Sequence, residues 1–306
     1  MEETRQMRTT ALTTSIGAQV HGVDLKQPLA QDLADGIRQA LAEHAVLVFR
    51  EQHLNNAQQE TVARLFGPLE PAPSRKLFGL NDPVRVIERP VFMGYDQGVI
   101  PYAPRREDYQ GFHVDDGFCA QIPNVATLRP VALAPAGGDT LWSSMASVFE
   151  SFSPAMQAWL ETLNGVNAAP PNFRATVGFY DLPKDAQRRF DDEEAVRVHP
   201  VVVKHPITGR KSLFVSPTYT AAIEDLSHRE STMLLRFLFG ESVRADFVYR
   251  HHWEMGDLVI WDELATLHAG PEKFAPERQL VRVYGGLTTP TAARPRTASP
   301  SVAIPA

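Results

Sequence analysis

Short segments rich in β-branched and aromatic residues, separated by glycine and proline turns, recur through most of this 306-residue chain. The candidate strands are residues 45–49, 126–128, 131–133, 139–142, 196–203, 211–215, 247–252, 257–261 and 278–285. Many short strands with only a few helices favour a double-sheet jelly roll, that is, a double-stranded β-helix. Sheet-rich barrels and sandwiches often use this many residues for one domain. We therefore expect a mostly β protein with flanking helices, built as a single domain over residues 1–288, and a mobile C-terminal tail over residues 289–306 that is rich in Pro, Thr, Ser and Ala.

Helical periodicity accompanies these strands. It covers residues 29–44, 56–66, 147–163 and 226–239. Gly240 is a good C-terminal stop for the last of these helices. Residues 205–209 carry the turn punctuation of a hairpin between two candidate strands. Residues 69–111 are irregular, which is typical either of a functional loop or of a solvent-exposed excursion.

Composition excludes several classes of function. The chain is 43% hydrophobic and 22% charged, as packed soluble proteins are. Its 30 Lys and Arg residues against 36 Asp and Glu give a formal charge of −6, so we expect no nucleic-acid partner. The N-terminus lacks a signal-peptide pattern and no apolar run approaches ~18 residues, so we expect a cytoplasmic protein with no membrane partner. Cys119 is the only cysteine, so any metal must be bound through nitrogen and oxygen.

A histidine and an aspartate lie two residues apart at His113 and Asp115. On extended backbone, residues two apart face the same side, so both side chains can reach one metal ion. This spacing alone is a weak signal, because the chain contains other histidine-x-acid pairs, and most such pairs are ordinary surface or core residues. These are His228-Arg229-Glu230 and His252-Trp253-Glu254.

Three features distinguish the pair at His113. It follows an irregular, glycine-bearing loop, where an open coordination site could face a cleft. The strand-like segment 256–262 precedes His268 and could carry that imidazole to the same cavity. Arg278 and Arg282 lie four apart on a predicted strand, so both would project from one face. Two imidazole nitrogens and one carboxylate oxygen can occupy one face of an octahedral Fe(II) and leave the other face open for a chelating cosubstrate and dioxygen.

Several short segments occur in a defined order between about residues 11 and 288. They are Val46-Leu47-Val48-Phe49-Arg50, Arg64-Leu65-Phe66-Gly67, Phe112-His113-Val114-Asp115, Gly137-Gly138-Asp139-Thr140-Leu141-Trp142, His205-Pro206-Ile207-Thr208-Gly209-Arg210-Lys211 and Gly256-Asp257-Leu258-Val259-Ile260-Trp261-Asp262. As an ordered set, these segments resemble the Fe(II)- and 2-oxoglutarate-dependent dioxygenases of the taurine dioxygenase-like family.

The resemblance implies a role for each matching residue. His113, Asp115 and His268 correspond to the iron ligands, and Thr140 and Arg278 correspond to the binders of the far carboxylate of 2-oxoglutarate. A planar guanidinium grips a carboxylate through two hydrogen bonds, and a threonine hydroxyl adds one donor. Fe(II), one aspartate and the dianionic cosubstrate sum to a charge of about −1, so a fixed cation is needed. The alternative for Arg278 is a strand arginine in a surface ion pair.

Two further residues are candidates for substrate binding. By resemblance, Arg282 lies near the iron-bound end of the cosubstrate; it either meets an acidic group on the substrate or only stabilises the cosubstrate or a neighbouring carboxylate. Asp116 could meet a hydroxyl or an amine of the substrate, or cap a turn. The chain departs from the family at Glu263-Leu264, where Asn-Arg is common, and at residues 69–73, where taurine enzymes hold the sulfonate with polar residues. We therefore do not expect taurine as the substrate.

The resemblance implies an enzyme that uses Fe(II), 2-oxoglutarate and O2, hydroxylates a small anionic organic substrate and releases succinate and CO2. A carbon–heteroatom bond would break where the hydroxyl lands beside the heteroatom. A zinc hydrolase on a cupin-like jelly roll is an alternative, because zinc accepts the same donors; it leaves Thr140 and Arg278 unexplained. A non-catalytic, ligand-binding jelly roll is a second alternative. We expect a small-molecule substrate and, from the family, a homo-oligomer.

Overall fold

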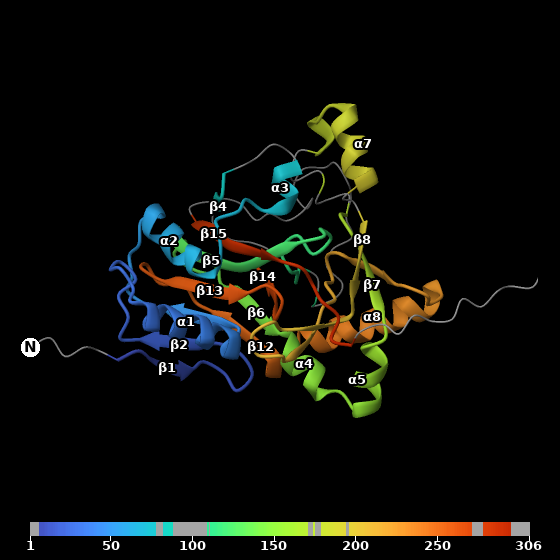
Figure 1. The fold of residues 1–306 in the computed structure, drawn as a ribbon, viewed down its shortest axis with the longest axis horizontal. Coiled ribbons are helices and arrows are strands. Elements are labelled where there is room, and N and C mark those ends of the chain that lie inside the picture. The colour runs from blue at the N-terminus through green and yellow to red at the C-terminus, as the bar shows by residue number, and fades with distance from the viewer. Residues whose placement is uncertain are drawn as a thin grey trace, which may run out of the picture.

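The computed structural model describes residues 6–77, 82–87, 109, 111–170, 174, 179–193, 196–270 and 278–294. Its main sheet has seven strands in the order β1-β2-β3-β13-β5-β15-β4 (Figure 1). These strands are β1 (Arg8–Ala11), β2 (Ala18–His21), β3 (Val46–Phe49), β4 (Val84–Ile87), β5 (Ile122–Ala132), β13 (Leu258–Asp262) and β15 (Gln279–Thr288). The central strands β3, β5 and β13 are antiparallel neighbours, so the first and last thirds of the chain meet in one sheet.

A three-stranded sheet of β12, β6 and β14 packs against this main sheet. Its strands are β6 (Thr140–Ser144), β12 (Val248–His251) and β14 (Thr266–Ala269). The core between the two sheets is aromatic: Trp142 of β6 and Trp261 of β13 have ring centroids 5.4 Å apart, and both are almost completely buried. Because both sheets contribute to one hydrophobic cluster, residues at their ends are held in fixed relation.

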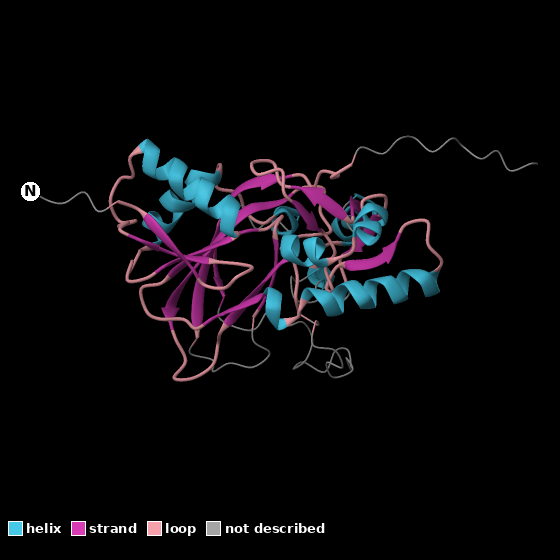
Figure 2. Cartoon of the chain, turned by 90° about the horizontal axis from the view of Figure 1, so that it is seen from below, coloured by secondary structure: helices cyan, strands magenta, loops and turns pink. Residues whose placement is uncertain are grey.

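Helices cover the outer face of the main sheet (Figure 2). They are α1 (Gln31–His44) and α2 (Asn56–Ala63), which is followed by the 3-10 turn η1 (Arg64–Phe66). The apolar stripe of α1, including Ile37 and Leu41, packs on Leu47 and Phe49 of β3. Asn55 and Gln58 form a capping box at the start of α2, which satisfies backbone donors that a helix N-terminus leaves unpaired.

The other described elements include those that pack around a second large hydrophobic cluster and those that carry Phe179 and Phe190 of a smaller one. They are α3 (Pro73–Leu77), α4 (Met145–Ser151), α5 (Pro154–Leu160), β7 (Asn164–Ala168), η2 (Phe179–Asp181), α7 (Lys184–Glu193), β8 (Val196–Pro200), β9 (Val202–Lys204), β10 (Lys211–Leu213), β11 (Thr220–Ile223), α8 (His228–Ser242) and η3 (Ala245–Phe247). Strands β9 and β10 form the expected hairpin around residues 205–209, and β11, β7 and β8 form a further small sheet.

The expected mostly β architecture with flanking helices is confirmed, but several of the expected element boundaries are wrong. The strand expected over residues 196–203 is two strands, β8 and β9, which belong to different sheets. The helix expected over residues 147–163 is two helices, α4 and α5, because Pro154 cannot continue the first and Ser153 instead caps the second. Gly240 lies inside α8, which continues to Ser242. Residues 126–128 and 131–133 belong to one long strand, β5, apart from Leu133.

The irregular stretch over residues 69–111 and the C-terminal tail are described only in part. Part of residues 69–111 forms α3 and β4, and residues 78–81, 88–108 and 110 lie outside the described residues. In the expected tail, the amide of Ala293 donates to the carbonyl of Val202 in β9, and residues 295–306 lie outside the described part. Among the described helices, none has the length and apolar character needed to cross a membrane.

Candidate metal centre and its surroundings

The backbone brings His113 and His268 together although they are far apart in the sequence. The two residues form an isolated antiparallel bridge, in which the amide of His113 donates to the carbonyl of His268 at 2.9 Å and the reverse bond is 2.8 Å. His268 lies in β14 directly opposite Trp142 of β6. The aromatic core between the sheets therefore fixes the strand that carries the second histidine.

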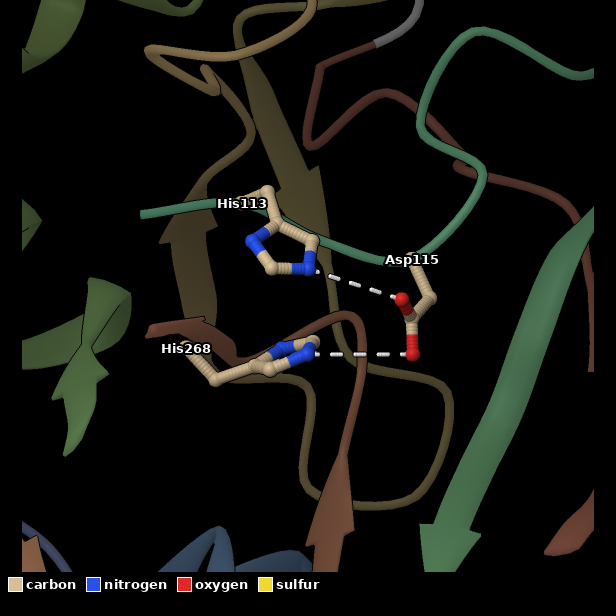
Figure 3. A group of neighbouring side chains, drawn as sticks. All are labelled: His113, Asp115 and His268. Atoms are coloured by element: carbon tan, nitrogen blue, oxygen red, sulfur yellow. Dashed lines mark ion pairs between the residues drawn. The ribbon is translucent and has the colours of Figure 1, made fainter. Parts of the chain in front are cut away.

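The side chains of His113, Asp115 and His268 point toward one another (Figure 3). Asp115 Oδ1 lies 3.6 Å from Nε2 of His113, and its Oδ2 lies 3.7 Å from Nε2 of His268. One potential ligand atom from each residue lies within 4.8 Å of the others. Within the described ranges, this is the group of acidic, histidine and cysteine residues that could hold a metal ion.

The chemistry of this donor set fits a divalent metal. The carbonyl of Gly111 lies 2.9 Å from Nδ1 of His113, so Nδ1 carries the proton and Nε2 presents its lone pair. Burial, followed by the field of His113, holds the pKa of His268 well below its usual value, which leaves a neutral imidazole. Its buried Nδ1 has no hydrogen-bond partner among the described residues. A metal on Nε2 requires the proton on that same Nδ1, so both histidines fit the role.

Asp115 is held as a carboxylate by two neighbours on β15. Burial alone would raise its pKa, but Arg282, His268 and His113 together hold that pKa well below the usual value. Arg282 Nη1 donates to Oδ2 at 2.6 Å and the Tyr284 hydroxyl donates to the same oxygen at 2.8 Å. Arg282 and Tyr284 are two residues apart on a strand, so they face the same side. The Nε of Arg282 is buried without a partner among the described residues.

Arg278 and Thr140 form a second polar cluster beside β14. Arg278 lies just before β15; its Nε donates to the carbonyl of Gly138 at 2.8 Å, and its Nη2 lies 3.4 Å from the Thr140 hydroxyl. The Trp253 indole also donates to that hydroxyl, at 3.0 Å. Both contacts use lone pairs of Thr140, so its own proton remains available for an anionic ligand. Burial lowers the pKa of Arg278 to about 10, so the side chain is a buried cation at neutral pH.

Asp116 is buried and faces Ser74 at the start of α3. The Ser74 hydroxyl donates to Oδ1 at 2.6 Å, and its backbone amide donates to Oδ2 at 3.2 Å. Burial raises the pKa of Asp116 to about 6, with a further rise from the negative charge of Asp115 and an opposing effect from Ser74. Each oxygen of Asp116 thus has a partner within the chain, and its contact with a substrate stays a prediction.

Several residues at this site were not predicted from the sequence. Tyr284 could have been found, because it follows Arg282 at the two-residue spacing of a strand. Gly138 lies in one of the ordered segments, but the sequence does not indicate its contact with Arg278. No sequence signal points to Trp253 as a partner of Thr140, because that contact depends on the pairing of β6 with β12.

Glu263 is the other unexpected member of the site. It lies in the turn between β13 and β14 and is fully buried. Its Oε1 accepts from the Trp261 indole at 2.8 Å, and its Oε2 accepts from the backbone amide of Asp115 at 3.0 Å. Burial, and then the charge of Asp115, raises the pKa of Glu263 well above its usual value.

Comparison with known proteins gives a consistent result. Residues 8–284 match the model of a family described as "Taurine catabolism dioxygenase TauD, TfdA family". The chain is 31% identical to an alpha-ketoglutarate-dependent 2,4-dichlorophenoxyacetate dioxygenase from Cupriavidus pinatubonensis, over 83% of this chain and 88% of the relative. It is 28% identical to an alkylsulfatase from Acinetobacter baylyi, over 94% and 87% of the two chains. The crystal structure of a taurine dioxygenase from Burkholderia xenovorans superposes with a TM-score of 0.73 at 30% identity and covers 93% of this chain and 91% of its own.

Proposed function

Because the chain belongs to the taurine catabolism dioxygenase TauD, TfdA family, we propose that His113, Asp115 and His268 hold the Fe(II) of this enzyme. The protein is a 2-oxoglutarate-dependent non-heme iron dioxygenase, and its cofactor and cosubstrates are Fe(II), 2-oxoglutarate and O2. The observation that supports the ligand assignment is the convergence of these three buried or half-buried side chains within 4.8 Å. When bound, the iron supplies the redox chemistry that couples decarboxylation of 2-oxoglutarate to hydroxylation of the substrate.

Arg278 and Thr140 are proposed to bind the far carboxylate of 2-oxoglutarate. The guanidinium is a fixed cation in a buried site, so it can offset the excess negative charge of the aspartate and the dianionic cosubstrate. The carbonyl of Gly138 orients Arg278 through Nε. The Trp253 indole occupies a lone pair of Thr140 and so directs the hydroxyl proton away from itself. These residues orient the cosubstrate; they do not transfer electrons.

The proposed substrate is a small organic anion. Arg282 contacts Asp115 through Nη1 and keeps a buried Nε without a partner among the described residues, as a cation that awaits an acidic group would. Two relatives have names that point to anionic substrates, an alkylsulfatase and a 2,4-dichlorophenoxyacetate dioxygenase. Hydroxylation of a carbon bonded to an ester or ether oxygen would release that oxygen group, so cleavage of a carbon–oxygen bond is the proposed outcome.

The finer structural expectations are part of the same proposal. Antiparallel pairing in the main and three-stranded sheets, and the shared core between them, support a double-stranded β-helix. We also propose that residues 1–288 form one domain and that the enzyme is a cytoplasmic homo-oligomer without nucleic-acid or membrane partners.

Succinate production tests the ligand assignment. Enzyme loaded anaerobically with Fe(II) would be given 2-oxoglutarate, O2 and a panel of alkyl sulfates, aryloxy acids and sulfonates. We expect succinate release to rise with an anionic substrate, and Asp115→Ala to abolish it almost completely, because one ligand of three is lost. Asp32→Ala, on the exposed first turn of α1, is the matched control. Near-normal succinate release by Asp115→Ala would show that Asp115 is not a metal ligand. Bound zinc in a protein that forms no succinate would favour the zinc hydrolase.

A further inference from the structure

Glu263 lies next to two of the proposed metal ligands, Asp115 and His268. It is fully buried in the turn between β13 and β14. Asp262 holds that turn, because its Oδ1 accepts the backbone amides of Leu264 and Ala265 at 2.8 and 3.0 Å. The Glu263 backbone amide donates to the carbonyl of Asn124 at 3.2 Å. The carboxyl group therefore projects from a rigid turn rather than from a flexible loop.

Both oxygens of Glu263 face N–H donors. Oε1 accepts from the Trp261 indole at 2.8 Å, and Oε2 accepts from the backbone amide of Asp115 at 3.0 Å. The second bond fixes the main chain of the aspartate whose side chain is proposed to bind iron. Glu263 thus contacts that ligand through its main chain.

Nδ1 of His268 is a buried donor close to Glu263. It lies 4.0 Å from Oε2 of Glu263 and has no partner among the described residues. Coordination through Nε2 places the proton on Nδ1, and a buried N–H without an acceptor is unfavourable. A movement of roughly 1 Å would bring the pair to a normal hydrogen-bond length. His113 already has such an acceptor in the carbonyl of Gly111.

We propose that Glu263 is a positioning residue for the metal centre: it holds the backbone of Asp115 and accepts the Nδ1–H of His268 when a metal binds. This inference rests on the proposed function, because it takes Asp115 and His268 as ligands. Glu263 acts through these two residues and does not itself touch the metal.

Metal affinity, rather than activity, is the primary test. Glu263→Gln keeps the size of the side chain but turns an NH2 group toward Trp261 on one side or toward Asp115 and His268 on the other. We expect anaerobic titration with Fe(II) and with Mn(II) to show binding weakened by about 10–100-fold, the usual effect of removing a partner of a metal ligand. Glu263→Asp keeps a carboxyl group but withdraws it from His268, and it should lose less affinity than Glu263→Gln.

A second readout separates positioning from general destabilisation. In the Co(II)-substituted enzyme, the Nδ1–H protons of the ligating histidines give exchangeable, hyperfine-shifted proton NMR signals. We expect the His268 signal to exchange slowly with solvent in the wild type and rapidly, or beyond detection, in Glu263→Gln. Asn167→Ala removes a buried side chain from the separate sheet containing β7 and serves as the control for lost stability; it should leave metal affinity and this signal unchanged.

The outcomes are distinct. Affinity of Glu263→Gln within twofold of wild type, or a loss matched by Asn167→Ala, would overturn the positioning role. If the wild type binds no metal, or Asp115→Ala binds it as tightly as the wild type, the ligand assignment itself fails. If Asp115→Ala loses metal affinity as expected while Glu263→Gln binds the metal as tightly as the wild type, only the positioning role of Glu263 is refuted.

Discussion

At the scale of single residues, each proposed metal ligand depends on a partner elsewhere in the chain. The structure brings His113, Asp115 and His268 together, the three residues that the family resemblance implies as ligands. Their partners could not be predicted, because a bond such as that from the Asp115 amide to Glu263 joins residues 148 positions apart. Only a known strand register could bring such positions into contact.

Gly138 provides a test of what fixes the position of the Arg278 side chain. Its φ is +85°, and a Cβ there would lie 2.8 Å from Cδ and 2.9 Å from Nε of Arg278. Gly138→Ala should therefore displace the guanidinium and weaken 2-oxoglutarate binding by about tenfold or more, since a hydrogen bond to a charged group contributes about 1.5–3 kcal/mol. The measurement is the dissociation constant of 2-oxoglutarate for the Mn(II)-loaded enzyme without O2.

The neighbouring glycine is a matched control for this substitution. Gly137 also has a positive φ, +73°, but a Cβ there meets nothing within 4 Å. Gly137→Ala therefore introduces a comparable backbone strain without the collision. Equal cosubstrate affinity in the two variants would show that strain in the turn, and not the position of Arg278, controls binding.

At the scale of elements, periodicity located the long helices and failed at short or interrupted ones. The pattern over residues 147–163 continues across Ser153 and Pro154, although the helix cannot, because proline lacks the amide that would continue it. Gly240 was expected to end α8, but packing of Leu238 and Phe239 in the core carries the helix past it. Strand β14 was missed because four residues, Thr266–Ala269, are too few to show an alternation.

His199 links β8 to the segment that follows His113 and Asp115. Its Nε2 donates to the carbonyl of Cys119 at 2.9 Å, and burial lowers its pKa from 6.5. Below pH 6.5 the unfolded chain binds a proton that the folded protein does not take up, so stability is lost as the pH falls. One such proton gives a slope of at most about 1.4 kcal/mol per pH unit.

We expect His199→Gln, which keeps a donor for that carbonyl but does not titrate, to flatten the decline of unfolding free energy between about pH 6.5 and 5. Urea denaturation of the metal-free protein at several pH values measures this slope. His228→Gln, on the exposed start of α8, controls for the loss of an imidazole. A slope equal to that of the wild type would mean that His199 is protonated in the folded protein.

At the scale of the whole molecule, the short strands predict a sheet-rich fold, and the ordered motifs resemble a dioxygenase family. The sequence could not show which strands are neighbours. In the structure, β5 pairs with both β13 and β15, while β6 pairs with β14. Within residues 113–278, this pairing brings the three proposed metal ligands together and places the proposed cosubstrate residues Thr140 and Arg278 in contact with each other.

Ligand binding should therefore stabilise the molecule as a whole. The proposed metal ligands join the loop at His113 to β14, and the proposed cosubstrate residues join β6 to the start of β15. A ligand at 100 times its dissociation constant adds about 2.7 kcal/mol to the free energy of unfolding, which corresponds to a rise in Tm of roughly 4 °C for a chain of this size. Calorimetry without O2 should show one increment in Tm with Mn(II) and a second with 2-oxoglutarate.

Arg278→Lys should keep the first increment and lose most of the second, because a point charge cannot replace the guanidinium fork, whereas Asp115→Ala should lose both. If Arg278→Lys retained the full second increment, other residues would have to bind the cosubstrate, and the role proposed for Arg278 and Thr140 would be wrong.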